Sequence, residues 1–540
     1  MADYGRQAIL KEPEPVTTAP SGRSRPAITL AVVLLAFVTV PMSISGAAVA
    51  LPGIGTDLHA AGAPLQWVMN AYNLTFASFM LVAGSTADLV GRRRTFAVGA
   101  GTFAVGSLAA AAAPGIALLD VARAVSGIGS AGVFASGGAI LATTFDGAAR
   151  TRAFAALGSA AGLGLAAGPT LAGWLVSALG WRSTFGLHAA LVMVALAGVA
   201  AVAESRAPRR PRLDTTGAVV FVAGLGALVL GAVQGPDWGW SSPAVLALLT
   251  AGAGLLVAFV ALQARSADPL LDLSLMRNRR FLALCMVPVV TTFGFVTLLT
   301  YLPTYLVGAG GMSAQRAGTV LLLMTGPVLL APPLAGGLVN RGVSARVLIT
   351  ASLAMFAAGN AWLTVIGPST PVAVIAGPLL LIGLGAGVSF GVGDGAAMSL
   401  VGPERAGMAT GFLNTMRIGS EAIVIAVFGA VLVSLIGARV GSPALAAQVG
   451  AGDLSGGDPA ALAAGFTHAL HVALYGTAAV CAAGAVAIAV ALAKPRADVA
   501  ASPASAASPA SPPSPPSPAS QRSQRSQRSH EDSPLPTEVA

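Results

Sequence analysis

The stretch Gly84-Ser-Thr-Ala-Asp-Leu-Val-Gly-Arg-Arg-Arg94 is a short charged segment between two long apolar runs. Loops rich in basic residues are retained on the cytoplasmic side of membrane proteins, so the three adjacent arginines assign this loop to that side. Its glycines allow close approach of the backbone, and Asp88 lies where one helix is expected to end and the next to begin. The segment therefore predicts a charged helix junction on the cytoplasmic face of a membrane protein.

The composition supports a membrane location. The 540-residue chain is 55% hydrophobic and only 9% charged, with a mean hydropathy of +0.79, far from the composition of soluble domains. The net charge of +9 does not indicate a nucleic-acid partner, because the arginines lie at the ends of apolar runs rather than in one patch. The two cysteines, Cys285 and Cys481, lie inside apolar runs and predict neither a disulfide framework nor a metal site.

Fourteen apolar runs are long enough to cross a membrane, since a spanning helix needs about 20 apolar residues. We place them near residues 28–52, 66–88, 95–113, 117–142, 153–178, 183–203, 214–233, 243–263, 281–307, 317–339, 345–366, 371–400, 408–436 and 467–493. The sequence therefore predicts an all-α integral membrane protein with 14 transmembrane helices. The last loop between two spans, about 437–466, is rich in Gly, Ala and Asp and is expected to be mobile.

The arginines alternate between loops in the way that a cytoplasmic N-terminus predicts. One face would hold Arg92 to Arg94, Arg150, Arg152, Arg206 through Arg212, Arg277 through Arg280, Arg341, Arg346, Arg405 and Arg496. The other face would hold Asp57, His59, Arg182, Asp237, Arg316, Arg439, Asp453 and Asp458. We therefore expect both termini in the cytoplasm and the chain in the plasma membrane.

A second segment repeats the pattern of the 84–94 loop and divides the chain into two halves. Gly336-Gly-Leu-Val-Asn-Arg-Gly-Val-Ser-Ala-Arg346 repeats the order glycine, polar residue, basic residues, and it aligns Asn340 with Asp88. The alignment gives two six-helix halves in register, with two further helices inserted between them. Duplicated helical halves around a central cavity are a common design of secondary transporters.

The expected domains follow from this alignment: a disordered cytoplasmic N-terminus at 1–26, a six-helix bundle at 27–203, a two-helix insert with its linkers at 204–280, a second six-helix bundle at 281–493, and a disordered Ser/Pro/Arg tail at 494–540. The arginines of the tail leave open a contact with anionic membrane lipid, beside a plain solvated tail. The sequence assigns no role to the two inserted helices.

Four motifs carry a resemblance to a known family. They are Gly84-x-x-x-Asp88-x-x-Gly91-Arg92-Arg93-Arg94, Arg123-Ala-Val-Ser-Gly127-Ile-Gly129, Gly162-Leu-Gly-Leu-Ala-Ala-Gly168-Pro169-Thr-Leu-Ala-Gly173 and Tyr301-Leu-Pro303-x-Tyr305-Leu306. They resemble the helix 2–3 loop, the helix 4 arginine motif, the helix 5 antiporter motif and a helix 9 pattern of the fourteen-helix drug:proton antiporters of the major facilitator superfamily. The resemblance covers about residues 27–493.

The resemblance implies a secondary-active exporter of lipophilic organic compounds that works by proton antiport and alternating access. It also implies a small lipophilic or cationic substrate and a proton gradient as the driving force. It implies no cofactor, no ATP and no required oligomer. A narrower exporter of a metabolite or amino acid is the alternative transporter. A membrane-embedded sensor or enzyme is the alternative of another class, and the chain lacks both a phosphate-binding loop and metal-ligand spacing for it.

The loop from Gly84 to Arg94 is the expected gate. A carboxylate at a helix junction can accept hydrogen bonds from the free N–H groups of a helix start and pair with arginines, so Asp88 is either a latch that breaks when the halves rock or a static cap. The resemblance favours the latch. The expected gating residues are Gly84, Asp88, Gly91, Arg92, Arg93 and Arg94.

Charged residues inside a membrane are costly and mark functional sites. Arg417 and Glu421 are four residues apart in one span, which is pairing distance on a helix, and Asp394 in the preceding span is a possible partner of Arg417. The resemblance implies an acid in the first span, where this chain has Ser43. We therefore place proton coupling at Glu421 and Asp394. The alternatives are that these residues form static neutralising pairs, or that proton coupling has weakened or been lost.

Asp120 and Arg123 are three residues apart in the fourth span and are expected to pair on one helix face. Arg123 resembles the family arginine that assists proton transfer. A neutralising pair that only tolerates burial is the equal alternative.

Two further sets of residues are candidates. In the fifth span, Gly162, Gly164, Gly168 and Gly173, with Pro169, are expected to bring a small face against neighbouring helices. A cavity for an amphipathic compound needs aromatic and amide groups. Its candidate lining residues are Asn70, Tyr72, Asn73, Phe76, Phe293, Tyr301, Asn360, Phe390 and Asn414.

Overall fold

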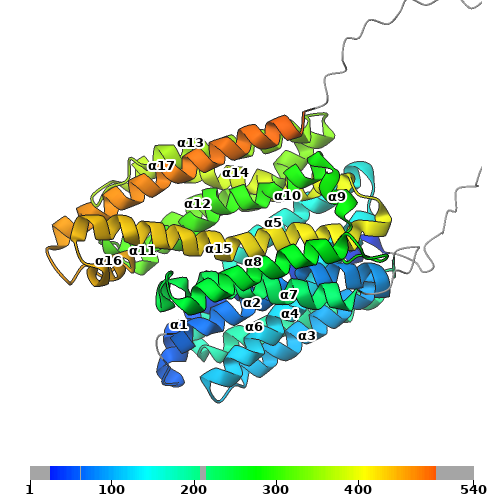
Figure 1. Cartoon of the computed structure of the whole chain (residues 1–540), viewed down its shortest axis with the longest axis horizontal. Helices are drawn as coiled ribbons and strands as arrows, with labels where there is room; N and C mark the ends of the chain where they lie inside the picture. Colours follow the sequence, from blue (N-terminus) through cyan, green and yellow to red (C-terminus); the bar gives the residue numbers. More distant parts are fainter. Residues whose placement is uncertain (1–24, 61–62, 207–213, 494–540) are drawn as a thin grey trace, which may run out of the picture. The chain divides into compact units, whose positions relative to one another are not determined.

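The computed structural model describes residues 25–60, 63–206 and 214–493, and every regular element in these ranges is a helix (Figure 1). The termini that the sequence predicts to be disordered lie, up to residue 24 and from residue 494, outside the described residues.

The first six long helices form one bundle. They are α1 (Pro26–Asp57), α2 (Ala63–Val90), α3 (Arg92–Ala111), α4 (Ile116–Thr144), α5 (Gly147–Leu179) and α6 (Arg182–Gly198), followed by a short 3-10 turn, η1 (Val199–Ala201). Within this bundle α1 packs on α5 and α6, α2 packs on α4, and α3 packs on α4 and α6.

The second bundle repeats this scheme. Its first span consists of α10 (Arg279–Thr291), the π-helix η2 (Thr292–Val296) and α11 (Thr297–Gly308), and its others are α12 (Ala314–Asn340), α13 (Ala345–Leu363), α14 (Val372–Ser399), α15 (Ala406–Val440) and α17 (Pro459–Ala491). Here α10 packs on α15 and α17, α12 on α14, and α13 on α14 and α17. Each pair corresponds to a pair of the first bundle, as a duplication requires.

Thirteen helices of the described residues are long and apolar enough to cross a membrane. The fourteenth predicted span is α3, which falls outside that set. Its sequence is rich in Gly and Ala and begins with three arginines, so it is less apolar than the others. Because α3 packs along α4 within the same bundle, it completes the fourteen-helix arrangement.

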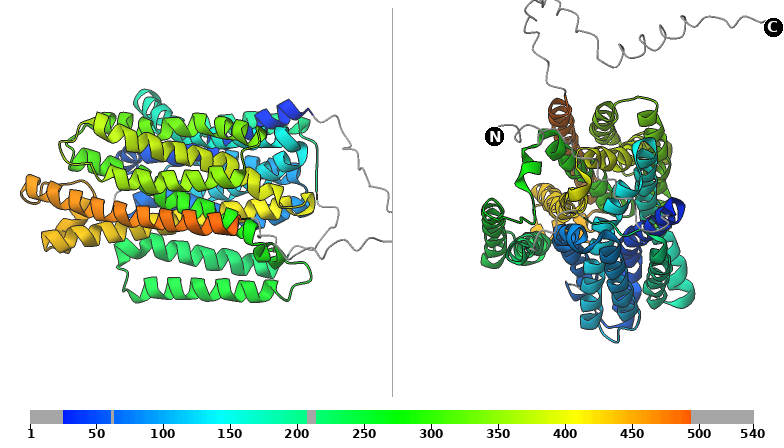
Figure 2. Two further views of the ribbon diagram at one scale, coloured as in Figure 1. Left: turned by 90° about the horizontal axis from the view of Figure 1, so that it is seen from above. Right: turned by 90° about the vertical axis from the view of Figure 1, so that its right-hand side faces the viewer.

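The two inserted helices, α7 (Thr215–Trp238) and α8 (Pro243–Gln263), form a hairpin at the edge of the bundles (Figure 2). The α7 helix contacts both α2 of the first bundle and α15 of the second. A segment that includes the short helix α9 (Leu273–Arg277) then leads from α8 to α10.

The predicted extent of the loop at about 437–466 is wrong. The α15 helix continues to Val440, α16 (Pro443–Gly450) occupies much of the loop, and α17 already begins at Pro459. Ser442 and Asp458 cap α16 and α17, each with a proline at the first helical position. These two start signals are readable in the sequence and outweigh the loop-like composition.

The two bundles meet toward one end of their helices. We call this end the arginine-rich face, because Arg92, Arg150, Arg341 and Arg405 lie at helix ends there; it is the right-hand end in Figure 1. The helix pairs that join the bundles are α2 with α15, α5 with α12, α5 with α14, and α4 with α15. We call the α2–α15 interface the seam.

Close packing inside the first bundle depends on particular glycines. A Cβ at Gly99 of α3 would lie 2.9 Å from the backbone of Gly129 and Gly132 on α4, whereas a Cβ at Gly101 would meet nothing within 4 Å. Gly99→Ala is therefore expected to destabilise the bundle by about 1–3 kcal/mol, the usual cost of overpacking. The midpoint of thermal unfolding in detergent should fall for Gly99→Ala and stay unchanged or rise for the matched control Gly101→Ala. Equal midpoints for the two variants would contradict this packing.

Candidate functional site

Asp88 joins the two bundles at the arginine-rich face. Its carboxylate accepts hydrogen bonds from the backbone N–H groups of Gly407 (2.9 Å) and Met408 (2.8 Å), in the first turn of α15. The same carboxylate binds the Arg92 guanidinium at 2.7 Å, and Arg92 also donates to the carbonyl oxygen of Pro403. We call these five residues the Asp88 cluster. Free N–H groups and the helix dipole make a helix start a good site for a carboxylate.

Both charges of the Asp88 cluster are buried, since Asp88 is 6% exposed and Arg92 is 1% exposed. A buried ion pair is tolerated when its remaining hydrogen bonds are made, and breaking it leaves an uncompensated charge. The carboxylate therefore has the two kinds of partner that the sequence predicts for it, an arginine and a helix start. That helix start belongs to the other bundle.

The rest of the loop is held by the end of the first bundle. Gly91 has a φ of +126°, which favours glycine, and a Cβ there would lie 2.6 Å from the Glu204 carboxylate. Glu204 accepts a hydrogen bond from the Arg93 backbone N–H at 3.1 Å and lies 3.7 Å from the Arg94 guanidinium. Glu204 was not among the predicted residues, because no local pattern links position 204 to this loop.

Glycines bring the backbones together along the seam. A Cβ at Gly84 would lie 2.3 Å from the Gly407 carbonyl oxygen, and a Cβ at Gly411 would lie 2.8 Å from the Met80 carbonyl oxygen. No larger side chain fits at these positions without separating α2 from α15. Gly84 therefore has the close backbone approach that the sequence predicts.

The repeated segment at 336–346 makes a weaker contact between the bundles. Asn340, at the end of α12, donates to the Ala148 carbonyl oxygen at 3.4 Å, at the start of α5. Asp88 contacts the fifth helix of the second bundle, and Asn340 contacts the fifth helix of the first. The two contacts are related by the duplication, but only that of Asp88 is charged and buried.

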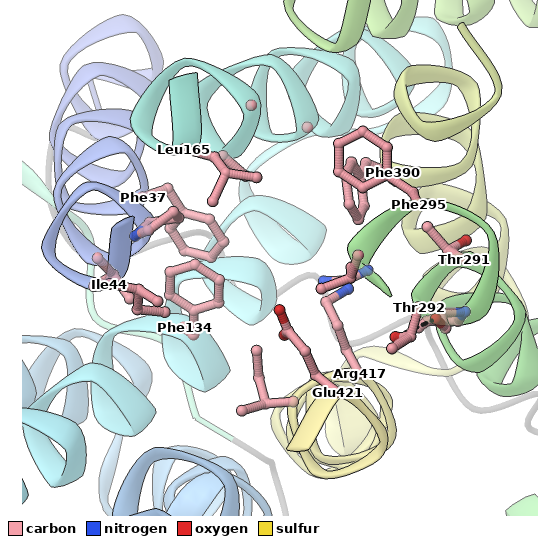
Figure 3. Close-up of a pocket in the computed structure, with 18 of the residues that line it drawn as sticks. Phe37, Ile44, Phe134, Leu165, Thr291, Thr292, Phe295, Phe390, Arg417 and Glu421 are labelled. Atoms are coloured by element: carbon pink, nitrogen blue, oxygen red, sulfur yellow. Dashed lines mark hydrogen bonds between the residues drawn. The ribbon is translucent and has the colours of Figure 1, made fainter. Parts of the chain in front are cut away.

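A central cavity of about 110 Å³ lies between the bundles (Figure 3). Aromatic rings line it from both sides. Phe37 and Phe134 stack with centroids 4.0 Å apart, and Phe76 lies edge-on to Phe134 at 5.4 Å. Across the cavity, Phe295 of η2 and Phe390 of α14 lie edge-to-face at 6.3 Å. Such a site suits an apolar or aromatic ligand.

Three charged residues line this cavity: Asp394, Arg417 and Glu421. The Arg417 guanidinium binds the Asp394 carboxylate at 2.5 Å and the Asn414 amide oxygen at 2.7 Å. The contact between Asp394 and Arg417 that the sequence suggested is therefore present.

The predicted pairing of Arg417 with Glu421 is wrong, because among the described residues no ion pair joins them. Asp394 and Asn414 occupy the guanidinium instead. The Glu421 side chain points into the cavity, as Figure 3 shows. The lining thus contains two carboxylates and one guanidinium.

The predicted pair of Asp120 and Arg123 is also absent. Arg123 is buried, donates to the Val68 carbonyl oxygen (2.9 Å) and to the Ser43 hydroxyl (3.0 Å), and lies 4.1 Å above the Tyr72 ring. Oδ1 of Asp120 and Nη2 of Arg123 are each buried without a hydrogen-bond partner among the described residues. Contacts with α1 and α2 thus hold the guanidinium away from the carboxylate on its own helix.

The glycines of α5 divide between two neighbours. Gly164 and Gly168 lie against α1, where added Cβ atoms would come within 2.1 Å of the Val38 carbonyl oxygen and the Ser45 hydroxyl. Gly162 lies against Val328 of the second bundle. The prediction is wrong for Gly173, since an added Cβ there would make only an ordinary contact at 3.9 Å. Pro169 lies inside α5, which continues through it.

Of the nine predicted cavity residues, Phe76 and Phe390 line the cavity, and the other seven do not. The seven are Asn70, Tyr72, Asn73, Phe293, Tyr301, Asn360 and Asn414. Most of the polar ones have partners elsewhere: Tyr72 bonds Ser130, Tyr301 donates to the Ile425 carbonyl oxygen, and Asn360 donates to Gly294 and Phe356. The hydroxyls of Tyr72 and Tyr301 and the amide nitrogen of Asn360 thus bond buried and backbone groups instead of facing a ligand.

The cavity residues that the sequence did not identify include Phe37, Phe134 and Phe295. Each looks like an ordinary core residue of a span. One signal was available near Phe295: Pro288 and Gly294 interrupt a span at the π-helix, a feature frequent at functional sites.

Comparison with known proteins identifies the class. Residues 33–424 match the family model of the Major Facilitator Superfamily, and the chain belongs to this family. It is therefore a multi-pass membrane transporter and not an enzyme.

Several relatives have names that describe export. The chain is 35% identical over 395 residues to the multidrug resistance protein Stp of Mycobacterium tuberculosis, covering 73% of each chain. It is 36% identical to the cephamycin export protein CmcT of Amycolatopsis lactamdurans, covering 73% of this chain and 82% of that one. It is 30% identical to the tetracenomycin C resistance and export protein of Streptomyces glaucescens, covering 79% and 80%.

Solved structures agree on the fold. The human organic anion transporter MFSD10 matches with a TM-score of 0.59 at 16% identity, covering 86% of this chain and 99% of that one. The proton:xylose symporter XylE matches with a TM-score of 0.58 at 13% identity, covering 85% and 94%.

The Asp88 cluster gives a direct prediction. Asp88→Asn leaves the buried Arg92 charge unpaired, which typically costs about 3–5 kcal/mol, so the bundles should separate at the arginine-rich face. A cysteine introduced by Thr410→Cys, at a buried position against Gly138, reports this separation through its labelling by a water-soluble maleimide. We expect labelling to rise in Asp88→Asn. It should stay low in the control Asp57→Asn, whose carboxylate forms an exposed ion pair at the opposite face. Unchanged labelling in Asp88→Asn would show that the cluster does not hold the bundles together.

Proposed function

We propose that the chain is a secondary-active exporter of lipophilic organic compounds, driven by proton antiport in the plasma membrane, with both termini in the cytoplasm. The relatives named for multidrug resistance and antibiotic export support the direction and the substrate class. The aromatic lining of the cavity supports a lipophilic substrate, and the proton gradient serves in place of a cofactor or ATP.

The topology rests on the distribution of arginines, which assigns the arginine-rich face to the cytoplasm. On this assignment, the Asp88 cluster and the glycine contacts of the seam close the cytoplasmic side. Export then requires the seam to open, so that a compound reaches the cavity from the cytoplasm, and afterwards to close again.

The position of Glu421 is the main support for proton antiport. Glu421 is a carboxylate without an ion-pair partner among the described residues, placed between aromatic walls at the centre of a membrane bundle. An acid in such a place is costly to keep charged, so its protonation responds to hydration and to the charge of a bound compound. Asp394, by contrast, is neutralised by Arg417.

The proposed cycle uses this difference. When the cavity faces outward, Glu421 takes a proton and the cavity loses one negative charge, which favours release of a cationic or polarised compound. When the seam opens, Glu421 gives the proton to the cytoplasm and the next compound binds. Glu421 lies on α15, the helix whose first turn, at Gly407 and Met408, binds Asp88. Met408 and Glu421 are 13 residues apart, or about 20 Å at 1.5 Å per residue.

Transport into everted vesicles tests the proposal, with a fluorescent lipophilic cation such as ethidium as the probe. The unaltered chain should accumulate the probe against its gradient when the vesicle interior is acidic, and a protonophore should abolish this accumulation. Glu421→Gln should bind the probe and equilibrate it without accumulation, because the amide cannot carry a proton. Asp453→Asn, an exposed carboxyl between α16 and α17, is the matched control and should behave as the unaltered chain.

Two outcomes would contradict the proposal. If Glu421→Gln still accumulates the probe under a proton gradient, proton coupling lies elsewhere in the chain. If the unaltered chain moves neither the probe nor any of a panel of lipophilic compounds, but does move an amino acid or a metabolite, the narrower exporter is correct.

A further inference from the structure

The segment 264–278, which we call the strap, runs from α8 to the start of α10 along the seam. Its residues contact both sides of that interface. On the α2 side, the Ser85 hydroxyl donates a hydrogen bond to the Leu270 carbonyl oxygen at 2.7 Å. On the α15 side, the Asp272 carboxylate binds the Arg405 guanidinium at 2.8 Å.

Two leucines anchor the strap in an apolar cluster of its own. Leu270 and Leu271 are 2% and 4% exposed. They pack with Leu81 of α2, with Phe221 and Phe259 of the inserted hairpin, and with Met408 and Phe412 of α15. The cluster thus contains side chains from the first bundle, the insert and the second bundle, and it covers the seam from outside.

The strap meets the Asp88 cluster at one residue. The backbone N–H of Met408 donates to Asp88, while the Met408 sulfur accepts a hydrogen bond from the Asp272 backbone N–H at 3.2 Å. The first turn of α15 is therefore held by a side chain of the first bundle and, independently, by the chain that leaves the insert. Arg405, just before that turn, also donates to the Ser274 hydroxyl at 3.1 Å.

The inserted hairpin fixes the start of the strap. The Gln263 amide, at the end of α8, donates to the Asp214 carboxylate at 2.7 Å and accepts from the Leu271 backbone N–H at 3.1 Å. Asp214 also caps the start of α7 through the Gly217 N–H. One buried glutamine thus connects both helices of the insert to the strap.

We propose that the insert and its strap are a second clamp on the gate, in which Ser85, Leu270 and Asp272 are positioning residues that hold α2 against the start of α15. The Asp88 cluster closes the seam from inside, and the strap closes it from outside. The two helices to which the sequence assigns no role are thereby part of the gate.

The geometry indicates which contact breaks when the seam opens. The strap makes three polar contacts with Arg405 and Met408 but one hydrogen bond with α2. It also continues directly into α10 of the second bundle, whose start is capped by Asn278. The strap therefore travels with α15, and the hydrogen bond from Ser85 to Leu270 breaks.

Cross-linking tests this assignment in the full chain, reconstituted in liposomes, with Cys285→Ala and Cys481→Ala as background. One variant carries Ser85→Cys and Leu270→Cys, and the matched variant carries Asp272→Cys and Arg405→Cys. Each pair is joined with a short bifunctional methanethiosulfonate reagent. Joining 85 to 270 should stop ethidium transport, and a reductant should restore it. Joining 272 to 405 should leave transport at the rate of the unjoined protein.

A second measurement does not depend on transport. Ser85→Ala removes a hydrogen bond whose usual net worth shifts a two-state equilibrium about fivefold, so labelling of a cysteine from Thr410→Cys should rise by about that factor. This labelling measurement tests the strap even if the variants with cysteine pairs do not fold, or if ethidium is not transported at all. The latter result would count against the proposed function and not against the strap.

The inference is overturned if protein joined between 85 and 270 transports at the unjoined rate, or if Ser85→Ala leaves the labelling unchanged. Loss of transport on joining 272 to 405 would also overturn it, because the strap would then not travel with α15. An effect of Ser85→Ala on the labelling rate without a change in thermal stability is the signature that separates a gate contact from a general structural one.

Discussion

The arrangement of this transporter depends on one buried interaction, the carboxylate of Asp88 at the N-terminus of α15. It joins residues that are 319 positions apart in sequence and that belong to the two different bundles. Inside a bundle, a carboxylate and a guanidinium are tolerated only together and only with their hydrogen bonds made. The interaction is therefore either complete or strongly unfavourable, and that property makes a contact suitable as a two-state gate.

The α15 helix connects the functional parts of the chain. Its first turn donates backbone hydrogen bonds to Asp88 and accepts one from the strap at the Met408 sulfur. Its middle places Arg417 and Glu421 in the cavity lining, and Gly407 and Gly411 allow its close approach to α2. A rigid helix of 35 residues transmits a displacement at one end to the other. In the proposed cycle, proton binding in the cavity and opening at the arginine-rich face would both act on this one helix, so their coupling needs no chain of intermediate residues.

Much of the fold was predictable, because local sequence patterns indicate the membrane spans, the duplication and the charged loop. The partners of Asp88 and the contact between Asp394 and Arg417 were also anticipated, but the two pairs predicted within a single helix were wrong. Spacing along one helix predicted that Arg417 pairs with Glu421 and Arg123 with Asp120, but side chains from other helices reach both arginines: Asp394 from α14, and Ser43 from α1. Amides such as Asn360 were expected in the cavity and instead bond the backbone. Phe37 and Phe134 form its wall, although in sequence they resemble any core residue.

In the proposed cycle the two bundles rock about the cavity, and the Asp88 interaction sets the equilibrium between the states closed and open at the arginine-rich face. Spin labels at exposed positions test it by pulsed electron paramagnetic resonance: Arg152→Cys with Arg346→Cys at the arginine-rich face, and Leu179→Cys with Val365→Cys at the opposite face. When Asp88→Asn is added, the first distance should lengthen while the second shortens. If both distances stay unchanged, or both lengthen together, the two bundles do not alternate about the cavity.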